Sequence, residues 1–215
     1  MKRATPPIPF AGALLDEERH VCAFFHDEEE EYRVLLPFIK EGFDRGEKAV
    51  HVVNPHQRAG HLDRLAGAGI DVAAARSREQ LDLRGNTETY LHDGRFDSSR
   101  MLESFEQMVT DNAQGPYPVS RIVCRMDWAA EGQSHIEDLV EFESLVNHVW
   151  QRHDDAVICT YYLDKFGGDT VIDVMRTHPM VIIGGILQHN PFFVPPEEFV
   201  REFRERNARR MRHSA

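Results

Sequence analysis

Six short apolar segments alternate along the chain with longer segments of helical periodicity. They cover residues 20–25, 49–53, 81–83, 121–128, 156–163 and 180–186. Several are apolar at consecutive positions, which is typical of strands covered by helices on both faces. The pattern predicts an α/β fold with three layers around a mainly parallel sheet.

The segments between these strands predict helices. Asp27 is the expected N-cap of the first helix, and the acidic residues 28–31 suit the positive end of a helix dipole. Gly42 and Gly46 are expected to end this helix before the next strand. The remaining helices are expected within residues 56–72, 98–115, 134–153, 167–179 and 195–215.

The length of 215 residues, 41% of them hydrophobic, predicts one globular domain with a substantial core. We expect a lead-in at residues 1–17, the domain at 18–200 and a basic C-terminal helix or tail at 201–215. The arginines of this tail favour a solvated helix end over a patch that docks a partner or nucleic acid.

Charge and cysteine content narrow the function classes. A net charge of −11 disfavours attraction to nucleic acid or anionic lipid. No segment has the apolar length of a signal peptide or a membrane span, so we expect a cytoplasmic protein. Cys22, Cys124 and Cys159 are widely separated and odd in number, which predicts free thiols rather than a disulfide framework.

The turn after the first strand reads HDEEEE, where a nucleotide-binding unit would carry glycines and a lysine. Walker A is therefore absent, and the acidic side chains disfavour phosphate binding. Asp127, at the end of an apolar run, resembles a magnesium-binding aspartate only weakly. No motif of a nucleophilic or metal-dependent hydrolase is present, so we expect no catalytic residue.

Several strands are predicted to contribute thiol, imidazole or aromatic side chains. Alternate residues of a strand share one face. On the first strand these would be His20 and Cys22, on the strand over 121–128 Cys124, Met126 and Trp128, and on the strand over 156–163 Cys159 and Tyr161. His178, before Pro179, is expected in extended backbone at a helix-to-strand junction. Each residue alone is more simply explained by core packing, and only the collection suggests a pocket.

Four segments together resemble a known sensory domain. They read HVCAFFHDEEEEYRVLLPFIKEGFDRGEKAVHVV, RMDWA, EFESLVNHV and VICTYYLDKFGGDTVIDVMRTHPMVIIGGILQHNPFFVPPEEF. Over residues 18–200 the chain resembles the MEDS domain, the sensory domain of dichloromethane-repressor-type regulators in methylotrophs and methanogens. The resemblance implies a non-enzymatic domain that senses small hydrocarbon derivatives. It also implies a RecA/KaiC-like core without a phosphate loop.

The resemblance directs attention to the same side chains as the strand pattern. The expected ligand-binding residues are His20, Cys22, Met126, Trp128, Cys159, Tyr161 and His178. Neither a cofactor nor a metal ion is expected.

No output module is visible beside the sensory segment, so our leading hypothesis is a stand-alone sensor in signal transduction or transcriptional regulation. It would act through a separate signalling or regulatory protein, with homo-oligomerisation possible. One alternative is a RecA-like interaction or oligomerisation module without a small ligand. Another is a metal- or thiol-dependent enzyme in which His20, Cys22 and His178 converge with Cys124 or Cys159.

Overall fold

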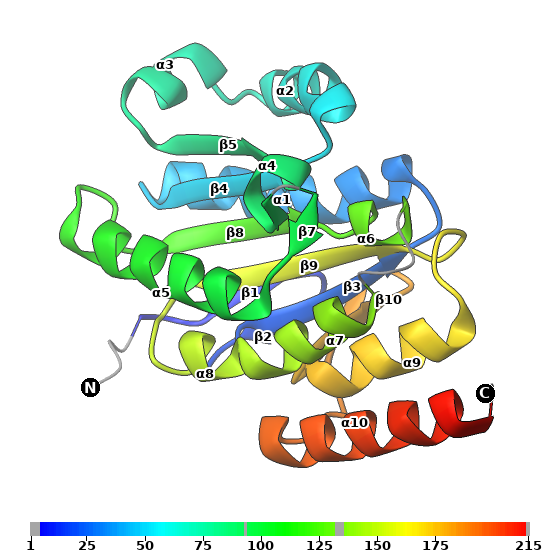
Figure 1. Ribbon diagram of the computed structural model, residues 1–215. Helices are drawn as coiled ribbons and strands as arrows, with labels where there is room; N and C mark the ends of the chain where they lie inside the picture. The colour runs from blue at the N-terminus through cyan, green and yellow to red at the C-terminus, as the bar shows by residue number, and fades with distance from the viewer. Residues whose placement is uncertain (1–4, 93, 132–135, 214–215) are drawn as a thin grey trace.

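A seven-stranded sheet forms the centre of the protein (Figure 1). The computed structural model describes residues 5–92, 94–131 and 136–213. The strands are β3 (His20–Phe25), β4 (Lys48–Val53), β5 (Leu81–Gly85), β8 (Ser120–Arg125), β9 (Ala156–Tyr162), β10 (Met180–Ile183) and β11 (Ile186–His189). Their order is β11-β10-β3-β9-β8-β4-β5, and every neighbouring pair is parallel except β10 and β11. The predicted α/β fold with a mainly parallel sheet is confirmed.

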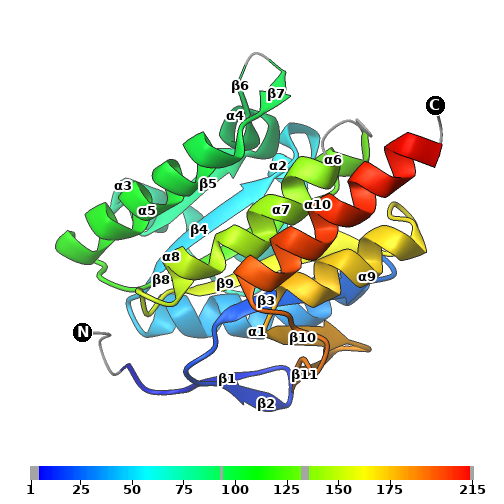
Figure 2. The ribbon, with the colours of Figure 1, turned by 60° about the horizontal axis from the view of Figure 1, so that its bottom comes forward.

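Helices cover both faces of this sheet. One face carries α1 (Glu28–Asp44), α2 (Arg58–Gly67) and α3 (Val72–Ser77), and the other carries α5 (Ser98–Gln114), α7 (Ile136–Leu145), α8 (Asn147–Trp150) and α9 (Gly168–Thr177). Outside this second layer, α10 (Pro196–His213) runs alongside α7 and α9 and packs on both (Figure 2). Among the described residues, no helix has both the length and the apolar character needed to cross a bilayer.

Short elements complete the chain. They are β1 (Ile8–Phe10), β2 (Ala13–Leu15), the 3-10 helix η1 (Pro55–Gln57), α4 (Asn86–Tyr90), β6 (Leu91–His92), β7 (Arg95–Phe96) and α6 (Trp128–Glu131). The first two strands form a hairpin within the expected lead-in, of which residues 1–4 lie outside the described part. The C-terminal helix crosses the expected boundary at residue 200, and residues 214–215 of the tail also lie outside the described part.

The two faces of the sheet bury separate cores. Cys22, Cys124 and Cys159 face α5, α7 and α9, whereas Val21 and Ile158 face α1. Strands buried on both faces need apolar side chains at consecutive positions, which is the pattern seen in the sequence. All three cysteines are buried free thiols, as predicted.

Two predicted strands are wrong in extent. The strand expected over residues 121–128 ends at Arg125, and Trp128 begins α6, so the alternation assigned to Met126 and Trp128 does not apply. The strand expected over 180–186 turns back at Gly184 and Gly185, whose φ angles are 60° and 76°. Glycine adopts this left-handed backbone without steric strain, so the chain reverses into β11.

The first helix begins as predicted, and it ends at Asp44 just before Gly46, whose φ of 74° and hydrogen bond from its N–H to the Phe43 carbonyl oxygen at 3.1 Å confirm the predicted glycine stop. The Asp27 carboxylate accepts a hydrogen bond from the Glu30 backbone N–H at 2.8 Å, which confirms the N-cap. Gly42, expected to stop the helix, lies inside it. A Cβ atom at this position would lie 2.7 Å from Arg121 Cδ, so this glycine is required for packing against the buried arginine.

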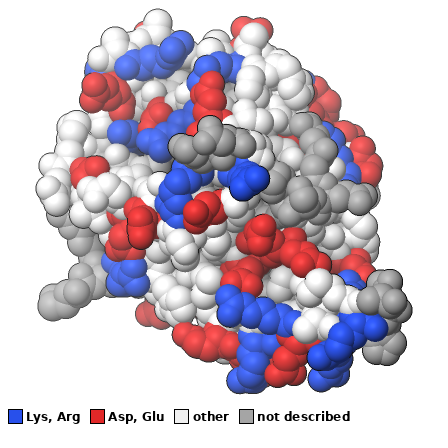
Figure 3. Space-filling view, in the orientation of Figure 1, with Lys and Arg blue, Asp and Glu red and all other residues white. Residues whose placement is uncertain are grey.

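Arginines of α10 pair with acids of the helices beneath it. Arg204 pairs with Glu141 of α7, and Arg206 and Arg210 pair with Asp173 and Asp169 of α9. Figure 3 shows basic and acidic side chains intermixed along this helix, at the bottom of the view. Exposed ion pairs are individually weak, so the burial of Phe199 and Phe203 contributes more than these pairs to holding α10 on the layer beneath.

A chain of buried hydrogen bonds joins β4 to α1 and α2. His51 Nδ1 lies 2.8 Å from His61 Nε2, and His61 Nδ1 lies 2.8 Å from the Tyr32 hydroxyl. Burial, and then the positive charge of Arg125, lowers the pKa of His51 from 6.5 to about 4. The folded protein therefore holds His51 neutral in mildly acidic solution, where the unfolded chain would protonate it.

This difference predicts an acid-sensitive stability. As the pH falls from 6.5 to about 4, the unfolded chain binds a proton at position 51 that the folded protein does not bind. The free energy of unfolding should fall by about 3 kcal/mol from this residue alone. In urea titrations across this range, His51→Gln should flatten the pH dependence, and the exposed control His56→Gln should not. Equal slopes in both variants would contradict this assignment.

Trp128 packs in an aromatic group of the core. Its ring stacks on Tyr90 at 4.8 Å between centroids, lies 5.6 Å from Phe96, and is 3% exposed. We predict that Trp128→Ala lowers the free energy of unfolding by about 3–5 kcal/mol, because it leaves a cavity, and that Trp128→Phe lowers it by less than half as much. Urea denaturation measures both values. An unfolding free energy unchanged in Trp128→Ala would show that this packing contributes nothing.

Candidate functional site

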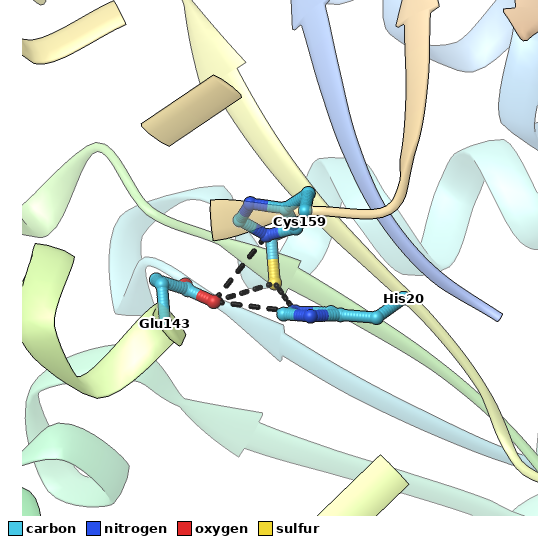
Figure 4. Close-up of side chains that lie close together, drawn as sticks. His20, Glu143 and Cys159 are labelled. Carbon is cyan, nitrogen blue, oxygen red and sulfur yellow. Dashed lines mark hydrogen bonds and ion pairs between the residues drawn. The ribbon is translucent and has the colours of Figure 1, made fainter. Parts of the chain in front are cut away.

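Four polar side chains from four parts of the chain meet inside the protein (Figure 4). They are His20 at the start of β3, Glu143 on α7, Cys159 on β9 and His178 between α9 and β10, here called the buried tetrad. Their exposed fractions are 1%, 1%, 4% and 0%. The site lies between the sheet and the α7–α8 layer, not beyond the carboxyl ends of the strands.

The fold explains this convergence. His20 and Cys159 lie on adjacent parallel strands and point to the same face of the sheet, because Cys22, two residues after His20, pairs with Cys159. Helix α7 covers this face and turns Glu143 toward it. His178 has extended backbone before Pro179, as predicted, and its ring closes the site from the other side.

The carboxylate of Glu143 is the centre of the tetrad. Its Oε2 atom lies 3.3 Å from His20 Nε2 and 3.4 Å from His178 Nε2. Cys159 Sγ lies 3.7 Å from both Glu143 Oε2 and His20 Nε2. One ligand-type atom from each residue lies within 4.8 Å of the other three. The tetrad thus gathers two nitrogens, one oxygen and one sulfur around a single point.

Asn147 fixes the orientation of the His20 ring. Its amide nitrogen donates to the carbonyl oxygens of Glu143, Ser144 and Thr177 at 2.8–3.1 Å, so its side-chain oxygen is left to accept. That oxygen lies 3.0 Å from His20 Nδ1. His20 must therefore carry a proton on Nδ1, and its Nε2 faces the tetrad.

The His178 ring is held in the same tautomer. Its Nδ1 atom lies 2.9 Å from the carbonyl oxygen of Val174, which can only accept a hydrogen bond, and 2.9 Å from the Thr177 hydroxyl. Nδ1 therefore carries the proton. His178 Nε2 points to Glu143 and has no hydrogen-bond partner that meets geometric criteria. Both imidazoles thus present the same atom to the carboxylate.

The remaining carboxylate oxygen is held by a tyrosine. The Tyr161 hydroxyl donates to Glu143 Oε1 at 3.0 Å. Burial alone would raise the pKa of Glu143, but His178 and His20, when a second proton sits on Nε2, outweigh it and hold that pKa well below the usual range. The glutamate is therefore an anion inside the protein.

The other groups resist ionisation. Burial, reinforced by the Glu143 charge, raises the pKa of Cys159 and of Tyr161 well above their usual values. Burial, and then the neighbouring His178, lowers the pKa of His20. The Glu143 anion thus has three neighbours, Cys159, Tyr161 and His20, whose shifted pKa values favour their neutral forms.

A cavity of about 50 Å³ adjoins the tetrad at His20. Its lining comprises Glu17, Glu18, Arg19, His20, Asn147, Trp150, Gln151, Pro179 and Phe193. The opening is large enough for only a few non-hydrogen atoms. It connects the surface near β3 with the edge of the buried site.

The expected ligand-binding residues are only partly brought together. His20, Cys159 and His178 belong to the tetrad, and Tyr161 bonds to it. Cys22 lies on β3, two residues after His20, with its Sγ 3.7 Å from the Met180 carbonyl oxygen. Met126 and Trp128 lie in the same apolar core but outside the tetrad. Ligand contact by any of the seven residues stays a prediction.

Sequence reasoning missed Glu143 and Asn147. The available signal is the helical stripe of Leu139, Val140 and Val146, because positions 143 and 147 fall on the same face. A carboxylate on an apolar helix face needs a partner inside the protein. Because α7 carries several other acidic residues, the buried position of Glu143 did not stand out in the sequence.

The acidic turn after β3 has an internal role. Glu31 is buried and lies 2.9 Å from Arg125 Nη2, and Glu28 lies 3.1 Å from Arg125 Nη1. The Tyr162 hydroxyl also donates to Glu31. These acids therefore balance a buried arginine, which goes beyond the expected stabilisation of the helix start.

Asp127 is similarly engaged within the protein. Its Oδ2 atom accepts a hydrogen bond from Asn54 at 2.7 Å and lies 3.1 Å from Lys165 Nζ. A lysine and an amide at this oxygen differ from the oxygen ligands that magnesium prefers. The geometry gives no support to a magnesium site at Asp127.

Comparison with known proteins assigns the chain to a family. No curated protein matches the chain. Residues 19–179, about three quarters of the chain, match the model of the family described as MEDS, the MEthanogen/methylotroph, DcmR Sensory domain. The matched segment contains all four residues of the tetrad. The chain therefore belongs to the MEDS family of sensory domains.

Proposed function

We propose that this protein is a non-enzymatic sensor in which a small hydrocarbon-derived molecule binds beside the buried tetrad and changes a surface read by a separate regulatory protein. The observation that carries the proposal is the convergence of four buried polar side chains, from four elements, next to a small cavity. Family membership supports the sensory role. Action in signal transduction or transcriptional regulation is part of the same proposal.

The energetics of burial favour a functional role. Placing a charge in the core is costly, and an apolar residue of similar size commonly gives equal or greater stability. Glu143 nevertheless lies 1% exposed, among side chains that favour neutral forms. A buried charge of this kind favours a site whose side chains rearrange when a ligand binds.

The size and lining of the cavity indicate the ligand class. About 50 Å³ admits a molecule of a few heavy atoms, and Trp150, Pro179 and Phe193 offer it apolar contacts. A one-carbon halide or alcohol meets both conditions. Larger hydrocarbons would require the α7–α8 layer to move.

The position of Glu143 offers a route to the surface. It lies on α7, which contacts α9 and α10. Phe199 and Phe203 of α10 are buried against this layer, and Arg204 pairs with Glu141, two residues before Glu143. A shift of α7 would therefore move α10, which is the surface we assign to the partner. This route favours a sensor over an interaction module without a ligand.

The strand order supports a RecA/KaiC-like origin for the core. The first strand of the parallel set, β3, lies centrally beside β9, as a phosphate-loop strand would. The acidic turn that follows it pairs with Arg125 instead of phosphate. We propose that the scaffold was retained after nucleotide binding was lost.

Dichloromethane and methanol are the probes for a test of this function. In sealed cells, a bound probe should raise the melting temperature and slow hydrogen exchange in α7 and α10. Phe193→Ala removes an apolar contact of the cavity and should weaken the response about tenfold. The matched control is Phe192→Ala, because Phe192 is 62% exposed and does not line the cavity.

Two outcomes would contradict the proposal. If neither probe changes the melting temperature or the hydrogen exchange of the folded protein, the ligand class is wrong. If both phenylalanine variants respond as the unchanged protein does, the cavity is not the binding site.

A further inference from the structure

The tautomers of the tetrad create an electrostatic conflict. His20 and His178 both use Nδ1–H for outward hydrogen bonds, so in their neutral forms they direct Nε2 lone pairs at Glu143 Oε2. Two nitrogen lone pairs then face one carboxylate oxygen at 3.3 and 3.4 Å in a buried space. A cation between them would convert this repulsion into attraction.

We propose that the buried tetrad is a binding site for one divalent transition-metal ion of the zinc class, held by His20 Nε2, His178 Nε2, Glu143 Oε2 and Cys159 Sγ. This inference rests on the proposed sensory function and names the component around which its site is built.

The distances fit four-coordinate geometry. A tetrahedral zinc ion, with bonds of about 2.0 Å to nitrogen and oxygen and about 2.3 Å to sulfur, places N–O ligand pairs about 3.3 Å apart and S–N or S–O pairs about 3.5 Å apart. The tetrad has N–O distances of 3.3 and 3.4 Å and S–N and S–O distances of 3.7 Å. The two remaining pairs, His178 Nε2 with His20 Nε2 and with Cys159 Sγ, lie within 4.8 Å, so binding would draw the ligands together by at most about 1.5 Å.

The chemistry of the ligands selects the class of ion. Imidazole and thiolate are borderline or soft donors, which favour zinc and neighbouring transition metals over magnesium or calcium. The charges also balance, because a divalent cation is neutralised by one carboxylate and one thiolate beside two neutral imidazoles. A buried site without net charge avoids most of the desolvation cost that an isolated Glu143 anion carries.

The surrounding residues resemble the outer shell of a metal site. Ligating histidines usually donate their second N–H to a carbonyl or carboxylate, which sets ring orientation. The side-chain oxygen of Asn147 accepts this hydrogen bond from His20, and the carbonyl oxygen of Val174 accepts it from His178. The Tyr161 hydroxyl occupies Glu143 Oε1, which leaves Oε2 for the ion. Three of the four ligands, His20, His178 and Glu143, are therefore oriented before the metal arrives.

The location of the site gives the ion a role in sensing. Its four ligands come from β3, α7, the α9–β10 junction and β9, so the ion would clamp the helical layer to the sheet. Four protein ligands complete its shell without a bound water, as in structural zinc sites. A molecule in the adjoining cavity would press on His20, one of the four ligands.

Metal analysis and cobalt substitution test the site in the full chain. Purified protein should contain one zinc per chain. After exchange for Co²⁺, it should show the intense visible d–d bands of four-coordinate cobalt and a near-ultraviolet thiolate-to-cobalt charge-transfer band. Cys159→Ser should remove the charge-transfer band. The matched control, Cys124→Ser, should retain the band. Cys124 is a buried thiol on β8 that pairs in register with Cys159 of β9, but it lies outside the tetrad.

Affinity measurements give a second readout. Glu143→Gln should weaken zinc binding about 100-fold or more, because loss of an orienting partner alone costs about 10- to 100-fold. Asn147→Leu should fall within that smaller range. Circular dichroism establishes that each variant is folded.

Three outcomes would overturn the metal site. They are folded protein that binds neither zinc nor cobalt, equal loss of the charge-transfer band in both cysteine variants, and unchanged zinc affinity in Glu143→Gln. The sensory proposal is tested separately. Stoichiometric zinc without a response to dichloromethane or methanol supports the metal site and rejects that ligand class, whereas a response in folded protein that binds neither zinc nor cobalt supports the sensor and rejects the metal site alone.

Discussion

The buried negative charge of Glu143 is the constraint on which the surrounding structure depends. It lies on an apolar helix face, and its two oxygens are used by Tyr161 on one side and by the imidazoles of His20 and His178 on the other. An unpaired charge in this position would cost several kcal/mol. The packing of α7 on the sheet and the extended backbone before Pro179 serve to bring these partners to it.

This constraint links the site to the rest of the fold. The tetrad joins two strands, one helix and one junction that are far apart in the sequence, and α10 is packed and ion-paired onto the same helical layer. On the opposite face, Glu31 and Glu28 compensate Arg125 where a nucleotide-binding protein would hold phosphate. The two faces therefore differ in kind: one encloses a closed internal ion pair, and the other encloses a set of metal-type ligands beside a cavity.

Much of this architecture could be predicted from sequence because strand burial and helix caps are local properties. Consecutive apolar residues marked β3 and β9, and Asp27 marked the start of α1. The turn at Gly184 and Gly185 was missed, because apolar residues on both sides of it concealed a reversal of the chain. His20, Cys159 and His178 were identified as candidates. Their meeting point depends on Glu143, and an acid in an acidic helix reveals its burial only through its position on the apolar stripe.

In our proposal, a cation rather than protons alone resolves the charge conflict at Glu143. Anomalous X-ray diffraction at the zinc absorption edge, from crystals of the full chain grown with zinc, tests it most directly. We predict one anomalous peak at bonding distance from His20 Nε2, Glu143 Oε2, Cys159 Sγ and His178 Nε2. The same four side chains gathered as described here, with no peak between them, would contradict it.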